Sequence, residues 1–464
     1  LSVKNKTDDK PSSSELQLQE QPWVDPIRAF WSVKDQPLVA FLDSSYRGFT
    51  DSRWSYLCLD PLFVLTVWPE RNILFFRELG VEIEISDWRS CLLGNLRLGR
   101  TLPPNAPPFH GGWIGWFSYE LGPQFDVVKT HAPDKSEPLA VFCFYDSVDC
   151  FDQGERRRWR ASLGLGASNA LEQVGGLLPV ADETELMSFV SNTSKDTYRS
   201  NVSRAVEYIR AGDVYQVNLT QIFSGPAPAN VPSAYLNLRS ASPCPYGAYL
   251  NTPAGQMLSS SPELFINFDA DTYLVTSRPI KGTRRRGVDH QEDVQLAEEL
   301  ASSAKDRAEN VMIVDLVRND LGRVCKPGSV ETLELCRRET HPSVFHLVST
   351  IRGTAEKGMS ILDILGAAFP GGSIIGAPKI RATEIITELE PGPRGAYTGA
   401  LGYINIDGSA KLAMGIRIAR ILQDRAWFGA GGGIVADSDP EDEYEESLTK
   451  ARAVMRSLGG FLTE

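Results

Sequence analysis

The sequence predicts an α+β fold in which two intertwined, β-rich lobes are wrapped by helices. The first observation is length, because 464 residues suit two lobes or one large intertwined domain better than a single compact core. The second is a series of short apolar runs with the alternation of strands. The third is a smaller number of segments with helical spacing, which add helices to the predicted sheets.

The N-terminal part of the chain is predicted to be a disordered tail followed by a β-rich lobe. Residues 1–21 are polar and offer little to bury. The lobe, residues 22–186, contains the apolar runs LVAFLDS and YLCLDPLFVLTVW, and NILFFRELGVEIEI alternates around a glycine as a hairpin does. Residues 167–185 are the predicted linker.

The C-terminal lobe, residues 187–464, is predicted to contain both helices and strands. A first helix ends at Gly212, a plausible C-cap, and the alternating strand YQVNLTQIF follows. One long helix is expected over residues 289–317, where Gly and Pro are scarce. The closing helix begins at Pro440 with Asp439 as its N-cap. The apolar stripe of the first helix comprises Tyr198, Val202, Ala205, Val206 and Ile209.

The composition argues against several classes of function. A net charge of -12 disfavours nucleic acid and anionic membranes as partners, so an anionic substrate would need a local positive pocket. The seven cysteines are scattered without a CxxC pair or a zinc-like cluster, as in a cytosolic protein with reduced thiols. No apolar run reaches the roughly 18 residues of a membrane span. We therefore expect no nucleic-acid partner, no membrane partner and a cytoplasmic location.

Lys281 stands in a constrained segment, between the dipeptides Pro-Ile and Gly-Thr. Proline fixes its own φ and glycine adopts backbone geometry closed to other residues, so this lysine can be aimed at a target. The alternative interpretation is one more solvated lysine beside the basic run Arg284–Arg286. A chemical role needs a lowered pKa, because a lysine of ordinary pKa, about 10.4, is almost fully protonated at neutral pH.

Carboxylates on two separate helical segments are candidates for a metal site. Glu443, Glu446 and Lys450 share one face of the closing helix, which also fits a solvated, salt-bridged helix end. Glu309 falls where a polar helical segment becomes apolar, at the edge of a core. Two carboxylates from separate elements are what a hard Mg²⁺ ion needs, with water and an anionic substrate as its other ligands.

Two glycine-rich segments do not carry nucleotide-binding motifs. GAGGGIV, residues 429–435, breaks the GxGxxG pattern, and GGSIIGAPK, residues 371–379, has Ala-Pro where a P-loop has Lys-Ser or Lys-Thr. Neither NAD nor ATP is therefore indicated. Such glycine-rich turns can still offer backbone N–H groups to a carboxylate.

Five motifs in order resemble those of the chorismate-utilising enzymes: SRPIKGT, SSAKDRAENVMIVDLVRNDLGRV, HLVST, FPGGSIIGAPKIRATEII and GAGGGIVADSDPEDEYEESLTKA. The resemblance is strong from about residue 191 to the end and looser from residue 31 through GGWIGWFSYELG. It implies the fold of that family, with stacked antiparallel sheets. Residues 22–186 would be a lobe like the N-terminal lobe of anthranilate synthase component I, and residues 187–464 the chorismate-binding catalytic domain.

The same resemblance implies roles for individual residues. Lys281 would attack ring carbon two of chorismate, and Glu263 would protonate the hydroxyl that leaves carbon four. From the residue alone, Glu263 could equally be a strand-end carboxylate, and His346 a packed histidine; by resemblance His346 lies near the ring. Mg²⁺ would bind Glu309 and Glu446 and hold a carboxylate of chorismate. The remaining substrate-binding residues implied are Gln216, Thr283, Ser373, Tyr397, Arg417, Gly431, Gly432, Gly433 and Lys450.

Gln216 and Lys281 narrow the implied reaction. Family members that add water to chorismate place a lysine base at the position of Gln216, whereas ammonia-using members have glutamine. Anthranilate synthases generally carry alanine at the position of Lys281, so the resemblance implies amination at carbon four, a transferase reaction in the branch to 4-aminobenzoate and folate. Anthranilate synthase component I is the nearest alternative, and a non-catalytic scaffold that binds chorismate or an amidotransferase is the second.

The source of ammonia is expected to lie outside this chain. No cysteine stands in a G-x-C-x-G nucleophile elbow, so a separate glutamine amidotransferase subunit is the implied partner in a heterodimer. Feedback control by tryptophan is not expected, because FLDSSY stands where anthranilate synthases carry an LLES signature. Ser44 in this stretch could line a remnant amino-acid pocket.

Overall fold

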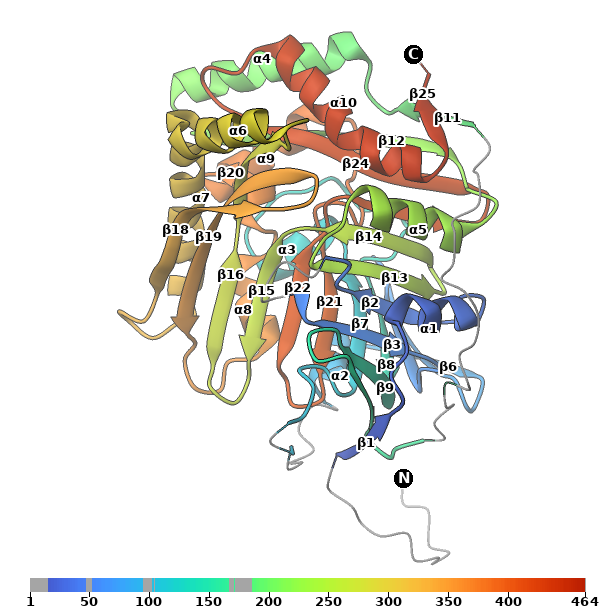
Figure 1. Cartoon of the computed structure of the whole chain (residues 1–464). Helices are drawn as coiled ribbons and strands as arrows, with labels where there is room; N and C mark the ends of the chain where they lie inside the picture. The colour runs from blue at the N-terminus through green and yellow to red at the C-terminus, as the bar shows by residue number, and fades with distance from the viewer. Residues whose placement is uncertain are drawn as a thin grey trace, which may run out of the picture.

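The computed structural model describes residues 16–46, 52–94, 102–103, 105–166, 171 and 186–463. Two large sheets dominate it, one of 13 strands and one of 12, and almost all pairs of neighbouring strands are antiparallel. Helices cover the upper and outer faces of these sheets (Figure 1). The predicted α+β class, with stacked antiparallel sheets in intertwined lobes, is confirmed.

The 13-stranded sheet joins strands from both ends of the chain. The central pairing of β2 with β13 connects its N-terminal and C-terminal parts. In spatial order its strands are β1 (Gln17–Gln21), β10 (Arg157–Ser162), β9 (Ser147–Asp152), β3 (Trp54–Cys58), β2 (Ala40–Asp43), β13 (Tyr246–Thr252), β14 (Gly255–Ser261), β23 (Ile418–Leu422), β24 (Arg425–Ile434), β12 (Gln216–Pro226), β11 (Met187–Ser191) and β25 (Gly460–Leu462), and β20 (Gly376–Ala377) pairs with β12.

The 12-stranded sheet is mixed in the same way, because β21 from the C-terminal half pairs with β7 from the N-terminal half. The predicted hairpin is β5 and β6 at one edge. In spatial order the strands are β17 (Ile280–Arg285), β19 (Val344–Thr354), β16 (Leu274–Arg278), β15 (Leu264–Asp269), β22 (Ala410–Met414), β21 (Ala400–Asn405), β7 (Gly112–Phe117), β8 (Ala140–Tyr145), β4 (Phe63–Val67), β5 (Asn72–Phe76) and β6 (Val81–Ile85), and β18 (Glu331–Thr340) pairs with β19.

Two cores result from this arrangement. The larger fills the space between the sheets, where Trp113 and Phe142 of one sheet belong to the same buried cluster as Tyr56 and Cys150 of the other. The smaller lies between the 13-stranded sheet and α1, α5 and α10. The helices are α1 (Pro26–Val33), α2 (Trp88–Gly94), α3 (Gly122–Phe125), α4 (Lys195–Ala211), α5 (Val231–Ala241), α6 (His290–Ser302), α7 (Ala304–Gly322), α8 (Ile361–Ala368), α9 (Lys379–Leu389) and α10 (Pro440–Ser457).

Several helix ends follow the chemistry that the sequence indicates. Gly212 ends α4 at φ 85°, in the left-handed region that glycine enters without a Cβ clash. Asp439 caps α10 by accepting hydrogen bonds from the N–H groups of Glu441 and Asp442. The strand β12 covers the predicted YQVNLTQIF segment. These local predictions are confirmed.

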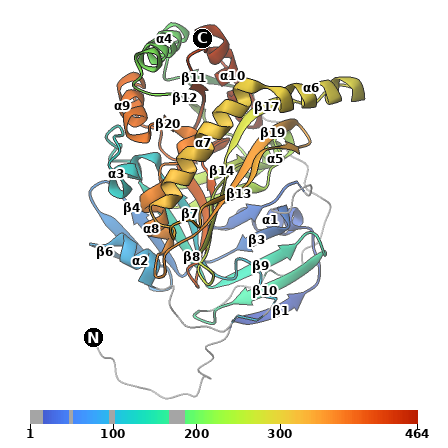
Figure 2. The same ribbon diagram turned by 90° about the vertical axis from the view of Figure 1, so that its left-hand side faces the viewer.

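Two predictions about elements were wrong. The predicted tail 1–21 ends in a strand, since β1 pairs with β10 over Gln17 to Gln21; residues 1–15 lie outside the described residues. The predicted single helix over 289–317 is two helices, because Ser303 leaves helical geometry and its hydroxyl accepts a hydrogen bond from the N–H of Asp306. α6 projects from the body of the molecule, and α7 runs along it (Figure 2).

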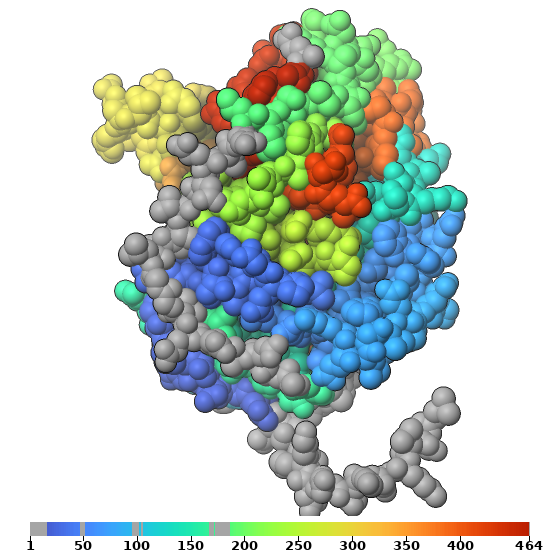
Figure 3. Space-filling model, turned by 90° about the vertical axis from the view of Figure 1, so that its right-hand side faces the viewer, coloured from blue at the N-terminus to red at the C-terminus, as the bar shows by residue number. Residues whose placement is uncertain are grey.

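The division of the chain at residue 186 does not divide the structure. Both sheets cross this boundary through the β2–β13 and β7–β21 pairings. Figure 3 shows the N-terminal residues, in blue, meeting the C-terminal residues, in green to red, along one continuous surface. The predicted linker 167–185 lies outside the described residues, except for Leu171.

Candidate active site

The Lys281 segment is shaped by a bulge in β17. The register of β17 against β19 shifts between Lys281 and Thr283, and the intervening Gly282 has φ 83°. A Cβ at Gly282 would lie 3.0 Å from Cβ of Asp306 at the start of α7, so the close approach of this helix also needs glycine. The Lys281 amine donates a hydrogen bond to the carbonyl of Ser373, 3.0 Å away. The bulge therefore directs one amine toward the Ser373 segment.

The environment of Lys281 differs from that of the neighbouring arginines. Burial lowers the pKa of Lys281, while Glu309 and Glu263 act in the opposite direction. Arg284 bonds Glu299 at 2.7 Å and Asp306 at 3.0 Å, and Arg285 and Arg286 are likewise paired with carboxylates of α6. The basic run thus attaches β17 to α6 and α7, whereas Lys281 points elsewhere.

Glu263 lies beside Lys281 in a buried corner between β14 and β15. Its side chain is 4% exposed, and the Ser373 hydroxyl donates a hydrogen bond to its Oε1 at 2.5 Å. Burial raises the pKa of Glu263 to about 7, although the Ser373 hydrogen bond and the charge of Lys281 oppose this shift. Ser373 thus contacts both predicted catalytic groups, one through its carbonyl and one through its hydroxyl.

Glu309 on α7 and Glu446 on α10 converge from separate helices. The charge of Glu446 disfavours ionisation of Glu309, and both carboxylates act on the charge of Lys281. Burial raises the pKa of Glu309, whereas Lys450, 2.7 Å from Glu446, lowers the pKa of Glu446. Two like-charged carboxylates in one place provide hard oxygen ligands and favour a cation between them, so these residues fit Mg²⁺. Among the described residues, no group of three or more His, Cys, Asp or Glu side chains could hold a metal ion by itself.

Glycines of β24 allow α10 and β12 to approach closely. A Cβ at Gly432 would lie 3.1 Å from Oε2 of Glu443, and one at Gly433 would lie 2.6 Å from Nε2 of Gln216. Lys450 donates a hydrogen bond to the Gly431 carbonyl at 2.9 Å. Residues 431–433 therefore bring the strand, Gln216 and the α10 face together.

Gln216 is fully buried, yet within the described part of the chain neither its amide oxygen nor its amide nitrogen has a hydrogen-bond partner. Burying an amide without a partner is unfavourable by roughly 1–3 kcal/mol, so such a group points to a ligand or ordered water. The sequence placed Glu443 on the same helix face as Glu446, but no site role was predicted for it. It is 7% exposed and accepts a hydrogen bond from Ser438 at 2.6 Å. Its spacing of three residues from Glu446 was the available signal.

His346 and Thr283 face each other on β19 and β17. Their Nδ1 and Oγ1 atoms are hydrogen-bonded at 2.8 Å, and His346 is 2% exposed. Burial and the charge of Arg417 hold the pKa of His346 well below its usual value, so the ring is neutral. Its Nε2 has no hydrogen-bond partner among the described residues and remains available to a ligand.

Arg417 lies near Glu263 and His346, whereas Tyr397 lines a different cavity. Arg417 is half-buried, its charge acts on Glu263 and His346, and it donates to the Ser242 hydroxyl at 3.4 Å, so it belongs to the pocket. Tyr397 packs against Gly429 and lines a neighbouring cavity that also includes Trp427. Its predicted contact with chorismate stays a prediction.

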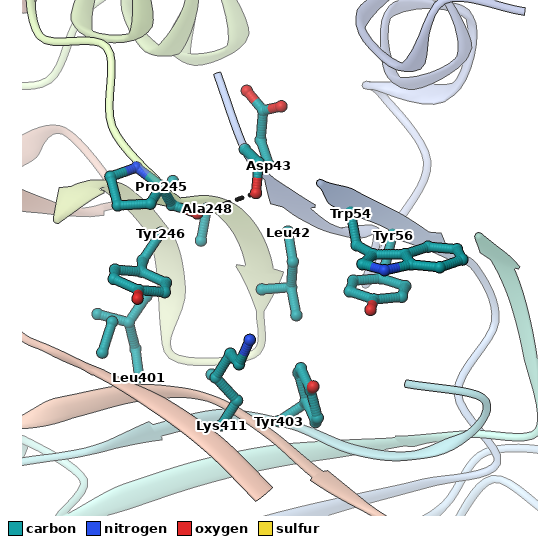
Figure 4. Close-up of a pocket in the computed structure, with 14 residues that line it drawn as sticks. Leu42, Asp43, Trp54, Tyr56, Pro245, Tyr246, Ala248, Leu401, Tyr403 and Lys411 are labelled. Carbon is teal, nitrogen blue, oxygen red and sulfur yellow. Dashed lines mark hydrogen bonds between the residues drawn. The ribbon is translucent and has the colours of Figure 1, made fainter. Parts of the chain in front are cut away.

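Ser44 lies at a second cavity, between the two sheets. β2 and β3 contribute Leu42, Trp54 and Tyr56, and β21 and β22 contribute Tyr403 and Lys411 (Figure 4). The Ser44 hydroxyl donates to the Pro245 carbonyl at 3.0 Å. The structure thus places Ser44 at a pocket, and binding of an amino acid there stays a prediction.

A buried amine, a carboxyl group that titrates near neutrality and a pair of further carboxylates meet where β17, β24, α7 and α10 converge. This combination suits an enzyme that transforms a small anionic molecule. Comparison with known proteins agrees with this class. The model of the chorismate binding enzyme family matches residues 70–456, and the chain belongs to that family.

Relatives within the family divide between two reactions. The chain is 36% identical over 484 residues to anthranilate synthase component 1 of Synechocystis sp., covering 94% of this chain and 95% of the relative. It is 38% identical over 436 residues to aminodeoxychorismate synthase component 1 of Escherichia coli, covering 92% and 95%. The crystal structure of anthranilate synthase component I from Streptococcus pneumoniae matches with a TM-score of 0.76 at 29% identity, over 87% of this chain and 92% of that one.

The described helices differ from membrane-spanning helices. Within the described ranges, none combines the length and the apolar composition that crossing a bilayer requires.

Proposed function

We propose that this chain is an aminodeoxychorismate synthase component I, which converts chorismate and ammonia to 4-amino-4-deoxychorismate through a covalent lysine intermediate. The observation that carries the proposal is the position of Lys281, hydrogen-bonded to Ser373 beside the buried Glu263. Anthranilate synthases, by the family resemblance, generally have alanine at this position and so lack this nucleophile. The relative from Escherichia coli, 38% identical, is an aminodeoxychorismate synthase component 1.

The proposed steps use groups whose pKa values are shifted in the required directions. Burial lowers the pKa of Lys281, which increases the neutral fraction that can attack ring carbon two. The pKa of about 7 at Glu263 keeps part of this residue protonated near neutral pH, so it can donate a proton to the hydroxyl that leaves carbon four as water. Ammonia then bonds to carbon four, loses a proton, and the bond between the lysine nitrogen and carbon two breaks.

Glu309 and Glu446 are the residues that would hold Mg²⁺. When bound, the ion would attract a carboxylate of chorismate and polarise the ring. Arg417 would bind a substrate carboxylate, and the free Nε2 of His346 would face the ring. Gly431, Gly432, Gly433, Thr283 and Lys450 would complete the substrate pocket.

Gln216 supports ammonia rather than water as the incoming nucleophile. Its unpaired amide offers a hydrogen-bond acceptor to ammonia and carries no basic group that would activate water. A separate glutamine amidotransferase subunit would release the ammonia, and free ammonium should support turnover without it. A cytoplasmic location and a role in 4-aminobenzoate and folate synthesis belong to the same proposal.

The test is chromatographic identification of the product made from chorismate, Mg²⁺ and ammonium at mildly alkaline pH. We expect 4-amino-4-deoxychorismate. The second candidate, anthranilate synthase component I, is favoured by the 36% identity to the Synechocystis enzyme, and anthranilate with pyruvate as products would establish it. Binding of chorismate with no product would favour the scaffold.

A further inference from the structure

The segment Phe369–Pro378 connects α8 to α9 and carries Ser373, the residue that touches both Lys281 and Glu263. The segment contains no charged side chain of its own. Pairing of β20 with β12 holds its C-terminal part, and contacts with groups outside the segment fix its two ends. A displacement of about 1 Å at Ser373 would change the alignment of both predicted catalytic groups.

Lys379, the first residue of α9, is 7% exposed and uses its amine on three acceptors. The amine donates to the carbonyls of Ala367 at 3.4 Å and Ala368 at 3.2 Å, the last two residues of α8. Carbonyls in the last turn of a helix accept no hydrogen bond from within that helix, and a cation near a helix C-terminus is stabilising. Because Lys379 follows Pro378 directly, one amine holds both ends of the segment together.

The third acceptor is Asp320 on α7, the helix that also carries Glu309. Its Oδ2 lies 2.8 Å from the Lys379 amine, and its side chain is 6% exposed. Asp320 also lines a small cavity together with Glu263, Gly372 and Ser373. The Lys379 amine therefore binds α7 at a residue that lines the same small cavity as Glu263 and Ser373.

We propose that Lys379 and Asp320 are positioning residues: their buried ion pair clamps both ends of the segment Phe369–Pro378 to α7 and so holds Ser373 against Lys281 and Glu263. Neither residue touches the reacting atoms. The kinetic part of this inference rests on the proposed function, whereas the structural part is independent of the reaction.

Lys379→Met tests the clamp, because methionine keeps an unbranched side chain without the charge or the three donors. We expect faster amide hydrogen exchange in residues 369–378 than in the wild type, with α1 and β10 unchanged. We expect kcat to fall about tenfold to a hundredfold, as for a small misplacement of catalytic groups, while KM for chorismate changes less. Asp320→Asn, which leaves the amine on its two carbonyls, should show smaller changes in the same direction.

The matched control is Asp149→Asn. Asp149 and Arg158 form a similarly buried pair on β9 and β10, 7% exposed on each side, in the N-terminal part of the 13-stranded sheet. We expect Asp149→Asn to lower the stability of the protein and to leave kcat and the exchange of residues 369–378 unchanged.

Lys379→Met with a lower melting temperature but wild-type kcat and wild-type exchange in 369–378 would overturn the clamp. Faster exchange in the segment without any chorismate amination by the wild type would leave the clamp standing and sink the proposed function. If Lys379→Met does not fold, Asp320→Asn decides by the same two readouts.

Discussion

Ser373 is the residue through which Lys281 and Glu263 share one environment. Its hydroxyl hydrogen bond favours the ionised form of Glu263, and burial favours the neutral form strongly enough to raise the pKa to about 7. Its carbonyl accepts from the lysine amine. One segment therefore contacts both groups that the proposed reaction uses, the acid and the nucleophile.

This arrangement predicts the pH dependence of Ser373→Ala. The proposed reaction needs protonated Glu263, so kcat/KM of the wild type should fall as pH rises through about 7. Removing the hydroxyl removes a bond that lowers the pKa of Glu263, so the pKa rises and the alkaline limb should move up by roughly half to one pH unit. Steady-state kinetics between about pH 5.5 and 9 measure the alkaline limb of the kcat/KM profile. An unmoved or downward-shifted limb would contradict the role of Glu263.

The sequence identified most of these residues because their motifs are long and ordered. These motifs predicted Ser373, Lys281, Glu263 and Glu446 as site residues, and hydrogen bonds and charge interactions connect the four in the structure. The two clamp residues, Asp320 and Lys379, look like ordinary charged residues in the sequence. Their pairing depends on how α7 packs against α9, which the sequence does not show. Burial of Gln216 without a partner was equally invisible in the sequence.

At the scale of elements, the glycines of β24 allow α10 to approach the strand closely, in addition to the apolar side chains that pack between them. Gly433 in particular leaves room for the Gln216 amide. Alternation alone predicts a strand here, but the reason for three consecutive glycines becomes clear only from the approach of β12 and α10.

Gly433→Ala should therefore impair the site more than the fold. Its Cβ would lie 2.6 Å from Nε2 of Gln216, which is closer than carbon and nitrogen can approach, so the amide must move. We expect ammonia-dependent kcat/KM to fall roughly tenfold or more, as for a misplaced catalytic group. Gly94→Ala on α2, where nothing lies within 4 Å of the new Cβ, is the control and should behave as the wild type. Equal activity of the two variants would argue against a role for the Gln216 position.

The break between α6 and α7 shows where element prediction failed. The single helix was predicted from the scarcity of glycine and proline, and neither residue occurs at the break. Ser303 instead ends α6 and caps α7, with Asp306 three residues later. The spacing Ser-x-x-Asp in the sequence is typical of a helix N-terminus. It was not used because the residues on both sides favour a helix.

At the scale of the whole molecule, the two halves of the sequence are parts of the same sheets. Sequence patterns predicted strands and intertwined lobes, but not which strands are neighbours. The pairings of β2 with β13 and β7 with β21 join residues about two hundred or more positions apart, and local periodicity carries no information on them.

The fragment 187–464 should therefore not fold alone, although it contains nearly all of the predicted site. Without β2 and β7, strands β13 and β21 would become open edges and the core between the sheets would be exposed. We expect aggregation or a non-cooperative thermal transition by circular dichroism, and partial recovery when residues 1–186 are co-expressed. A soluble 187–464 fragment with a sharp transition and chorismate turnover would refute the single-unit account.

The covalent role of Lys281 is the central claim, and mass spectrometry of the enzyme quenched with chorismate and Mg²⁺ in the absence of ammonia tests it most directly. We predict that the peptide containing Lys281 gains the mass of chorismate less one water, that added ammonium removes the adduct, and that Lys281→Ala shows no adduct and loses roughly a thousandfold or more in kcat. Turnover without any adduct, together with a Lys281→Ala variant that remains fully active or makes anthranilate, would contradict the account and move the chain to the anthranilate synthase reaction.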